Sequence, residues 1–335
     1  MQFSLILCIF SIITIGSTIA STAAIAISVA SLSITALTNY FIATSCTYHY
    51  FCPLFIGFTS NSPSTSFSSV MTERRQLLRD QCLKKPPNPL FLQEADFTRF
   101  IVIEKLKLVF CFIPKVSCTT WKRILYSAEN NGEKLEGVPH RKKLFSWLQD
   151  YSIFERQKIL STYYKAMFVR EPFARLASAY RDKIKSDWFK RFILLDRTKR
   201  ETKKVRTPFS AFVNRVIETN ATQLKNRGIE DQHWRSYEQI CPCEVDYDFI
   251  GHFENLDEEA PTLLKIIGVD GYVTFPDYHP SKTSPYMLEY YSQLSVDEIF
   301  QLKKLFDLDF KLFGYDFPGP LEGTLKKKVS QRKAE

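Results

Sequence analysis

The chain has 335 residues, of which 45% are hydrophobic and 14% aromatic, so it can bury a sizeable core and is not a disordered chain. It carries 45 Lys and Arg against 36 Asp and Glu, and this net charge of +9 favours anionic partners such as acidic glycans or nucleotide phosphates. The sequence has no zinc-finger spacing, RNA-binding aromatic motif or basic-region zipper, which argues against a nucleic-acid partner.

The amino-terminal segment is free of charge, because residues 1–72 contain no Asp, Glu, Lys or Arg. A membrane span needs about 20 apolar residues, and Leu5–Ala30 alone is long enough. We therefore expect residues 1–72 to be a membrane anchor or a signal region, and cleavage of a signal would give a secreted protein. Arginines follow this segment and none precedes it, the reverse of the usual charge pattern of a type II anchor.

A stem, a catalytic domain and a tail are expected after the apolar segment. Residues 73–107 are polar and include KKPPNP at Lys84–Pro89, which is typical of a stiff, extended spacer. We expect this stretch to be a stem and linker, residues 108–318 to be the catalytic domain, and residues 319–335 to be a basic, solvated tail.

The run that begins at Leu108 predicts a strand, a loop and a helix. Leu108–Ile113 is rich in β-forming residues and too short for a buried helix, while Thr119 or Thr120 can cap the helix that follows. Backbone N–H groups at a helix start favour negative charge, and Lys115 and Lys122 add positive charge there. The loop is therefore a candidate phosphate site.

A second unit repeats this order. We expect a strand at Ala166–Val169, a turn, and a helix with Pro172 at its first position. Arg170 then lies at the carboxyl end of the strand, where open α/β sheets bind ligands, and Ser178 lies two turns into the helix. Together the two units could bind two separated phosphates of one nucleotide.

The remaining elements are predicted from periodicity and caps. We expect a helical stretch around Arg141–Leu160, a strand at Tyr247–Phe253, and a helix at Leu256–Ile267 closed by Gly268. The capping box Ser295–Glu298 predicts a further helix that continues to Phe310.

Two surface features carry alternative interpretations. Lys185–Arg206 mixes basic and aromatic residues, and it is either a solvated helical face or an insertion that binds the anionic groups of a glycan. The one glycosylation sequon, Asn220-Ala221-Thr222, would be used only in a lumenal setting.

Taken together, the two strand–loop–helix units resemble the 5′-phosphosulfate and 3′-phosphate loops of Golgi carbohydrate sulfotransferases, the group that contains chondroitin, dermatan and HNK-1 sulfotransferases. The resemblance runs from Leu108 to Tyr315 and departs from the common pattern at Ser117 and Thr120, where Ala and Asn are frequent. Further motifs that support it are His233-Trp234, Cys241-Pro-Cys243, YDFIGHFE at Tyr247–Glu254 and DFKLFGY at Asp309–Tyr315.

The resemblance implies an α/β protein with a P-loop-like sulfotransferase fold, in which helices flank a central parallel sheet. It also implies that sulfonate passes from 3′-phosphoadenosine-5′-phosphosulfate to a glycan hydroxyl, with no metal required. Arg170 and Ser178 would bind the 3′-phosphate, and Lys115 would stabilise the leaving group. The rest of the donor loop would comprise Pro114, Val116, Ser117, Cys118, Thr119, Thr120 and Trp121.

The general base is less certain from the sequence. Histidine suits a base near neutral pH, and His140 lies between the two loops, where related enzymes place a catalytic histidine. His233 is the second candidate, and Asp or Glu stays possible. Arg175 and Arg181 lie on other helical phases than Arg170 and Ser178, which predicts salt-bridged surface groups.

Five cysteines follow the apolar segment, so at least one stays unpaired within a lumenal monomer. Cys241 and Cys243 are too close together for the usual zinc pair. Either could pair with Cys82, Cys111 or Cys118, and the spacing does not decide between these connectivities.

The expected protein is a membrane-anchored Golgi enzyme with a lumenal catalytic domain, whose leading acceptor is the 4-position of GalNAc in chondroitin. A catalytically inactive nucleotide- or glycan-binding member of the same fold is the alternative. A P-loop kinase is disfavoured because no G-x-x-x-x-G-K-[ST] motif occurs.

Overall fold

The computed structural model describes residues 64–86, 88–137, 139–184, 208–221, 232–276 and 283–332. These residues belong to one compact unit that begins at Pro63. Residues 1–63 of the predicted membrane anchor, the basic insertion Lys185–Arg206 and Thr222 of the sequon lie outside the described residues, whereas residues 64–72 belong to a helix of the compact unit. Within the described part of the chain, no helix is both long enough and apolar enough to cross a bilayer.

A five-stranded sheet forms the centre of the unit, in the order β3-β1-β2-β4-β5. The predicted parallel arrangement is confirmed for β2, β4 and β5, whereas β1 pairs antiparallel with both β2 and β3. The sequence did not predict β1 or β3. The strands are β1 (Phe100–Ile103), β2 (Leu108–Cys111), β3 (Ser146–Trp147), β4 (Tyr164–Val169) and β5 (Phe249–His252).

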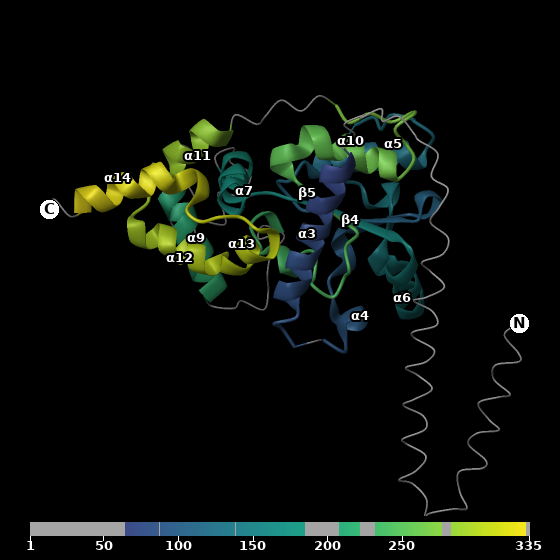
Figure 1. The fold of residues 1–335 in the computed structure, drawn as a ribbon, viewed down its shortest axis with the longest axis horizontal. Coiled ribbons are helices and arrows are strands. Elements are labelled where there is room, and N and C mark those ends of the chain that lie inside the picture. The colour runs from purple at the N-terminus through teal and green to yellow at the C-terminus, as the bar shows by residue number, and fades with distance from the viewer. Residues whose placement is uncertain are drawn as a thin grey trace, which may run out of the picture. The chain divides into compact units, whose positions relative to one another are not determined.

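The stretch predicted to be a stem packs into this unit instead. All four residues of β1 are fully buried, so residues 100–103 are core and not linker. Before them, α3 (Ser64–Cys82) buries Met71 and runs beside β5 (Figure 1). Arg74 Nη1 donates to the Ile250 carbonyl at 2.9 Å, so α3 covers backbone groups at the free edge of the sheet.

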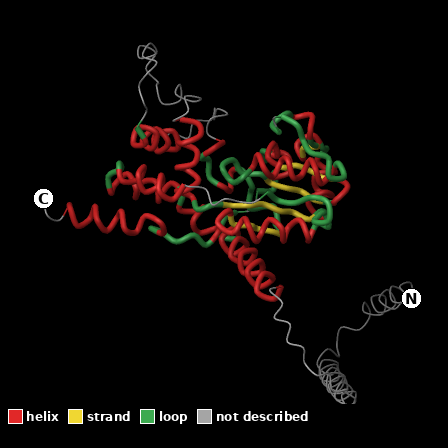
Figure 2. The backbone as a smooth tube through the Cα atoms, turned by 90° about the horizontal axis from the view of Figure 1, so that it is seen from above, coloured by secondary structure: helices red, strands yellow, loops and turns green. Residues whose placement is uncertain are grey.

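Helices surround the sheet and form a second group beside it (Figures 1 and 2). Near the sheet lie α3, α4 (Phe91–Glu94), α5 (Cys118–Glu129), α6 (Ile153–Thr162) and α10 (Leu256–Ile266). The second group contains α7 (Pro172–Ala179), a π-helical turn at Tyr180–Ile184, α9 (Phe209–Ala221), α11 (Thr283–Ser292), α12 (Val296–Leu305), α13 (Asp307–Phe313) and α14 (Glu322–Arg332).

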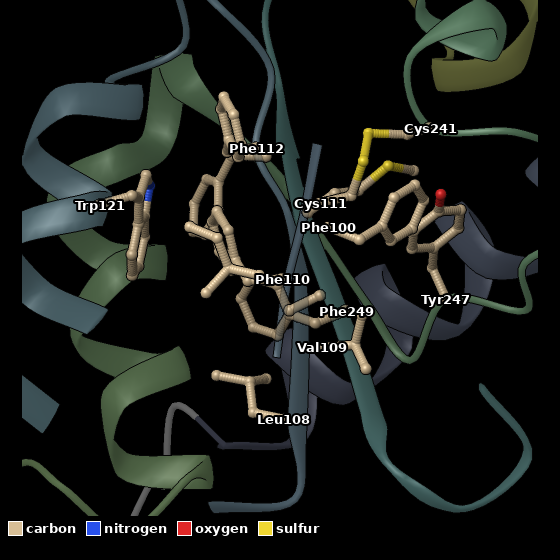
Figure 3. Close-up of a cluster of buried hydrophobic side chains, with 14 of the residues drawn as sticks. Phe100, Leu108, Val109, Phe110, Cys111, Phe112, Trp121, Cys241, Tyr247 and Phe249 are labelled. Carbon is tan, nitrogen blue, oxygen red and sulfur yellow. A yellow bond between two sulfur atoms is a disulfide. The ribbon is translucent and has the colours of Figure 1, made fainter. Parts of the chain in front are cut away.

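Each group has its own hydrophobic cluster. In the sheet cluster, Trp121 packs between Phe110 and Phe168, with ring centroids 5.0 and 4.7 Å away. Figure 3 shows Trp121 and Phe110 on the same side of β2. Gly251 in β5 gives the Phe168 ring its room, because a Cβ at position 251 would lie 2.2 Å from that ring.

Two disulfides settle the connectivity that the sequence leaves open. Cys111 pairs with Cys241, on the side of β2 opposite Trp121 (Figure 3), and Cys82 at the end of α3 pairs with Cys243. Cys118 is the free cysteine among the described residues. The disulfides tie β2, directly before the first loop, and the end of α3 to the segment that follows the His-Trp motif.

Several local predictions are confirmed and others are wrong. Pro172 is the first residue of α7, and Gly268 takes the left-handed conformation after α10.

The predicted helix around Arg141–Leu160 is wrong, since that stretch contains β3 and only its last part forms α6. The helix that begins after Ser295 ends at Leu305, and α13 starts at Asp307. Much of the predicted tail forms α14, which buries Leu325.

Candidate functional site

The first loop joins β2 to α5 through two left-handed residues. Lys115 has φ +73° and Ser117 has φ +50°, so the backbone turns sharply before the helix begins at Cys118. Ser117 is therefore the N-cap, and its side chain makes no capping hydrogen bond. The prediction that Thr119 or Thr120 caps this helix is wrong, because both residues lie inside the first turn.

The start of α5 can hold an anion. The N–H of Trp121 donates to the Ser117 carbonyl, so the amides of Cys118, Thr119 and Thr120 precede the first helical hydrogen bond. The first turn carries no acidic residue, so the positive end of the helix dipole is not neutralised there. This is the geometry of a phosphate or sulfonate site.

The second loop places Arg170 directly after β4, as predicted. Arg170 is 4% exposed, and its Nη1 donates to the Lys115 carbonyl at 3.2 Å. Its guanidinium lies 4.1 Å from the centre of the Phe253 ring, and its backbone N–H donates to the Tyr237 hydroxyl at 3.1 Å. The two loops are thus in direct contact. Ser178 is half-buried farther along α7.

The turn after Arg170 is held by residues of the Tyr247–Glu254 and Asp309–Tyr315 motifs. Glu254 Oε1 accepts the N–H of Glu171 at 2.9 Å, and the Tyr315 hydroxyl donates to Glu254 Oε2 at 2.9 Å. Glu171 caps α7, since its carboxyl accepts the N–H groups of Phe173 and Ala174. Burial raises the pKa of Glu171 to about 7. The Glu171 carboxyl already occupies the start of α7. Of the two helices that follow the loops, α5 is therefore the one whose N-terminus is open to a ligand.

The Lys115 side chain faces an acid that the sequence analysis did not single out. Its Nζ lies 2.7 Å from Asp182 Oδ2, and the side chain is 14% exposed. Desolvation lowers the pKa of Lys115, and the hydrogen bond to Asp182 opposes that shift. Asp182 lies in the π-helical turn after α7, so the ion pair is a second link between the two units.

Arg175, predicted to be a surface group, is buried and connects three segments. Its Nε donates to the Pro114 carbonyl at 3.2 Å, and its Nη1 donates to the Arg235 carbonyl at 2.7 Å. Its Nη2 reaches the Gln232 carbonyl at 3.4 Å. Arg175 therefore brings the segment that carries His233 against the first loop. Only the pattern of a polar residue on an otherwise apolar helix could have indicated this role.

His140 is brought beside the first loop. Its Nε2 lies 3.5 Å from Thr119 Oγ1, and its Nδ1 lies 3.3 Å from Lys122 Nζ. Desolvation and the charges of Lys122, Lys183 and Arg123 lower the pKa of His140. His140 is therefore a neutral imidazole near pH 7, which is the form that a general base requires.

Some side chains predicted to line the donor loop face the core. Trp121 is fully buried among aromatic rings, so its side chain does not line the site. Val116 is also in the core, and Pro114 contributes its carbonyl to Arg175. The residues that remain half-buried at the loop are Lys115, Ser117, Cys118, Thr119 and Thr120.

A family model described as "Sulfotransferase family" matches residues 98–316, which is more than half of the chain. The chain belongs to the sulfotransferase family. Rat carbohydrate sulfotransferase 11 is 32% identical over 276 residues, which cover 76% of this sulfotransferase and 74% of the relative. Rat carbohydrate sulfotransferase 10 is 33% identical over 272 residues, with 74% and 76% covered. Carbohydrate sulfotransferase 10 of Xenopus laevis is 31% identical over 286 residues, with 78% and 81% covered.

No solved structure matches this sulfotransferase significantly. The family and its relatives make the activity that of a carbohydrate sulfotransferase, and the family implies 3′-phosphoadenosine-5′-phosphosulfate as the donor. The anion-binding start of α5, with Lys115 and Arg170 beside it, suits such a donor. That the reaction needs no metal stays a prediction.

Proposed function

We propose that this sulfotransferase moves sulfonate from 3′-phosphoadenosine-5′-phosphosulfate to a hydroxyl of an acidic glycan, with the 4-hydroxyl of GalNAc in chondroitin as the leading acceptor. The observation that carries the proposal is the hydrogen bond from Arg170 Nη1 to the Lys115 carbonyl. It places the two candidate phosphate loops side by side, which one donor with phosphates at both ends requires.

The donor would bind across both loops. Arg170 and Ser178 would bind the 3′-phosphate, for which a guanidinium and a hydroxyl are suitable donors. The amides of Cys118 and Thr119 would bind the phosphosulfate, and the Lys115 ammonium would stabilise negative charge on the oxygen that leaves sulfur. Lys115 is suitable because it is mostly buried in a loop held by both Arg170 and Asp182.

The acceptor hydroxyl must lose its proton as it attacks sulfur, and His140 is our first candidate for the base. Its Nε2 points toward Thr119 at the start of α5, near the expected sulfonate. His233 is the second candidate, since Arg175 holds the carbonyls of its neighbours Gln232 and Arg235 against the first loop.

The acidic acceptor is supported by charge and by the resemblance to chondroitin, dermatan and HNK-1 sulfotransferases. The net charge of +9 favours a glycan that carries carboxylates or sulfates. The basic segment Lys185–Arg206 is our proposed contact for these groups, and it lies outside the described residues. The position of the accepting hydroxyl rests on the resemblance alone.

We also propose that the catalytic domain lies in the Golgi lumen, on a type II membrane anchor within residues 1–72. The disulfides Cys82–Cys243 and Cys111–Cys241 support an oxidising compartment, because such bonds are rare in the cytosol. A secreted form produced by signal cleavage is the alternative. Glycosylation at Asn220 in the expressed protein would support the lumenal placement.

The function is tested by transfer of radiolabelled sulfate from the donor to a panel of desulfated glycans. We expect the wild type to label chondroitin at the GalNAc 4-position, and Lys115→Ala to lose at least about 100-fold in kcat, the size of losses when a charge-stabilising donor is removed. Lys158→Ala is the matched control, since that lysine is exposed on α6. Donor binding without transfer to any glycan would instead support the inactive binding protein.

A further inference from the structure

A buried lysine and an exposed histidine meet beside the first loop. Lys122 projects from the second turn of α5, is 5% exposed, and has its Nζ 3.9 Å from the centre of the Phe112 ring and 5.5 Å from that of Trp147. The same Nζ lies 3.3 Å from His140 Nδ1. Within the described part of the chain, no carboxylate forms an ion pair with Lys122.

The hydrogen bond between these two nitrogens has only two possible directions. If Lys122 is an ammonium, it donates to Nδ1, so the neutral imidazole carries its proton on Nε2. If Lys122 is a neutral amine, its lone pair can accept the hydrogen bond from Nδ1–H, and Nε2 then keeps a free lone pair. Nε2 is the atom that faces Thr119 and the start of α5. Only the second arrangement leaves His140 able to take a proton from a hydroxyl on that side.

The surroundings bring loss of the Lys122 proton down to mildly alkaline pH. Burial, helped by the nearby charge of Arg99, lowers the pKa of Lys122 to about 8. The aromatic rings of Phe112 and Trp147 offer an ammonium only partial replacement for water. The charged groups that face His140 are Lys122, Lys183 and Arg123, and all three disfavour the imidazolium.

We propose that Lys122 is a positioning residue that, as a neutral amine, accepts the Nδ1 proton of His140 and thereby fixes the tautomer whose Nε2 can act as the base. The inference rests on the proposed function, in which His140 takes the proton of the acceptor hydroxyl. It goes beyond that function because it sets which protonation state of the pair is active.

The step is balanced in protons and bonds. The acceptor O–H bond breaks as its oxygen attacks sulfur, the proton moves to His140 Nε2, and the bond from sulfur to the phosphate oxygen breaks. The imidazolium then releases its Nε2 proton to water, while its Nδ1–H stays hydrogen-bonded to the Lys122 amine. The enzyme returns to its starting state, and the products are the sulfated glycan and 3′-phosphoadenosine 5′-phosphate.

The proposal is tested by the pH dependence of kcat/KM in wild type, Lys122→Met and Lys122→Arg. We expect the wild-type value to rise up to about pH 8, so that at pH 6.5 it is about 30-fold below its plateau. Lys122→Met should reach its plateau below pH 7, because only His140 then titrates. Lys122→Arg should lose about 100-fold at every pH, because arginine cannot accept the Nδ1 proton. The proposal would be overturned by a wild-type pH profile in Lys122→Met, or by a kcat/KM close to the wild-type value in Lys122→Arg.

Nitrogen-15 NMR of labelled histidines measures the tautomer without any turnover, with His140→Ala used to assign the signal. We expect Nδ1–H at pH 9 and Nε2–H at pH 7 in wild type, and Nε2–H at both pH values in Lys122→Arg. An Nε2–H tautomer at pH 9 in wild type overturns the proposal. Binding of 3′-phosphoadenosine 5′-phosphate within about threefold of wild type shows that a variant is folded.

The two readouts separate this proposal from the proposed function. If wild type transfers no sulfonate to any glycan, the proposed function fails while the NMR titration still decides the coupling of Lys122 and His140. If sulfonate is transferred and His140→Ala turns over normally, the assigned base fails, and with it the catalytic part of this proposal.

Discussion

The ammonium of Lys115 lies 2.7 Å from the carboxylate of Asp182, so the first loop is held to the turn that follows α7. Asp182 is half exposed, and its Oδ2 also lies 3.2 Å from Lys183 Nζ. Lys183 can therefore remain as the partner of Asp182 when Lys115 turns toward a ligand. A mostly buried ammonium is costly without a counter-ion. We therefore propose that the ion pair keeps Lys115 charged until an anionic donor takes the place of Asp182.

Asp182→Asn should strengthen binding of 3′-phosphoadenosine 5′-phosphate at pH 6.5. The substitution removes a carboxylate that repels the ligand and competes for Lys115, and a pair of this exposure is worth up to about 1 kcal/mol, or about fivefold in Kd. At pH 9 the gain should shrink, because the hydrogen bond that Lys115 donates to Asp182 raises the pKa of Lys115, and its loss makes the ammonium easier to deprotonate. Calorimetric titration at the two pH values measures both effects.

Asp246→Asn is the control for that experiment, since Asp246 is exposed and pairs with Arg79 at the other end of the parallel strands. It should leave Kd unchanged at both pH values. Weaker binding by Asp182→Asn at pH 6.5 would show that the carboxylate supports the ligand, which contradicts the exchange of partners argued above.

Arg175→Met should destabilise the protein and weaken donor binding together. The side chain has similar length but leaves the carbonyls of Pro114 and Arg235 without their donor, which costs about 1–3 kcal/mol for each buried group. We expect a loss of about 3 kcal/mol in the free energy of unfolding and at least a tenfold rise in KM for the donor.

Arg175→Lys separates charge from geometry in the same position. Lysine keeps the positive charge that methionine lacks, but it has no planar guanidinium that could donate to the Pro114 and Arg235 carbonyls together. We therefore expect KM for the donor to stay as high as in Arg175→Met. A wild-type KM in Arg175→Lys would mean that the charge alone shapes the loop. Denaturant unfolding and initial-rate kinetics supply the two measurements.

The sequence predicted the catalytic elements well because their signals are local. Leu108–Ile113 and Ala166–Val169 are short, apolar and β-rich, and Pro172 fixes a helix start wherever tertiary contacts allow one. Arg170 was placed correctly because a residue that directly follows a parallel strand lies at the ligand edge whatever packs around it.

Other features depend on contacts that sequence spacing does not encode. Phe100–Ile103 forms an antiparallel strand because β2 is available 5 residues later, and the polar residues around it hid this strand. Ser117 replaces the predicted threonine caps because two left-handed residues delay the helix. Arg175 became a buried connector only through carbonyls from two distant segments.

Asp309→Asn should change the pH dependence of stability. Asp309 is fully buried, accepts the N–H of Tyr237 at 2.9 Å, and burial raises its pKa from 3.8 to about 7. Between these values the folded protein binds a proton that the unfolded chain has lost, so this group's contribution to stability falls as pH rises from 4 to 7. Asparagine keeps an acceptor and does not titrate. Its stability relative to wild type should therefore improve by roughly 2–4 kcal/mol between pH 4 and pH 8.

Comparison of the two proteins isolates Asp309 from other groups that titrate in this range. Glu171 has a raised pKa and His252 a pKa lowered to about 3, but both are present in wild type and variant, so their effects cancel in the difference. Urea unfolding at the two pH values, under non-reducing conditions, measures the difference. A difference that is independent of pH would mean that Asp309 is ionised throughout.

Arg74→Ala and Arg79→Ala test whether α3 is part of the catalytic unit, because the two ion pairs lie on one helix and differ in burial. Arg74 bonds Glu259 through both carboxylate oxygens, with the side chains 13% and 5% exposed. Its loss leaves the buried Glu259 carboxylate without its counter-ion and the Ile250 carbonyl without the Arg74 donor, so we expect about 3 kcal/mol less stability. Arg79 pairs with exposed Asp246, and its loss should cost less than about 1 kcal/mol.

The same pair of variants also tests the coverage of the sheet edge. If α3 protects β5, Arg74→Ala should speed hydrogen exchange of the Ile250 and His252 amides, whereas Arg79→Ala should leave them protected. Equal losses of stability and equal exchange rates in the two variants would contradict this function of α3. In that case residues 73–82 would behave as the linker that their composition predicts, and the catalytic domain would fold without α3.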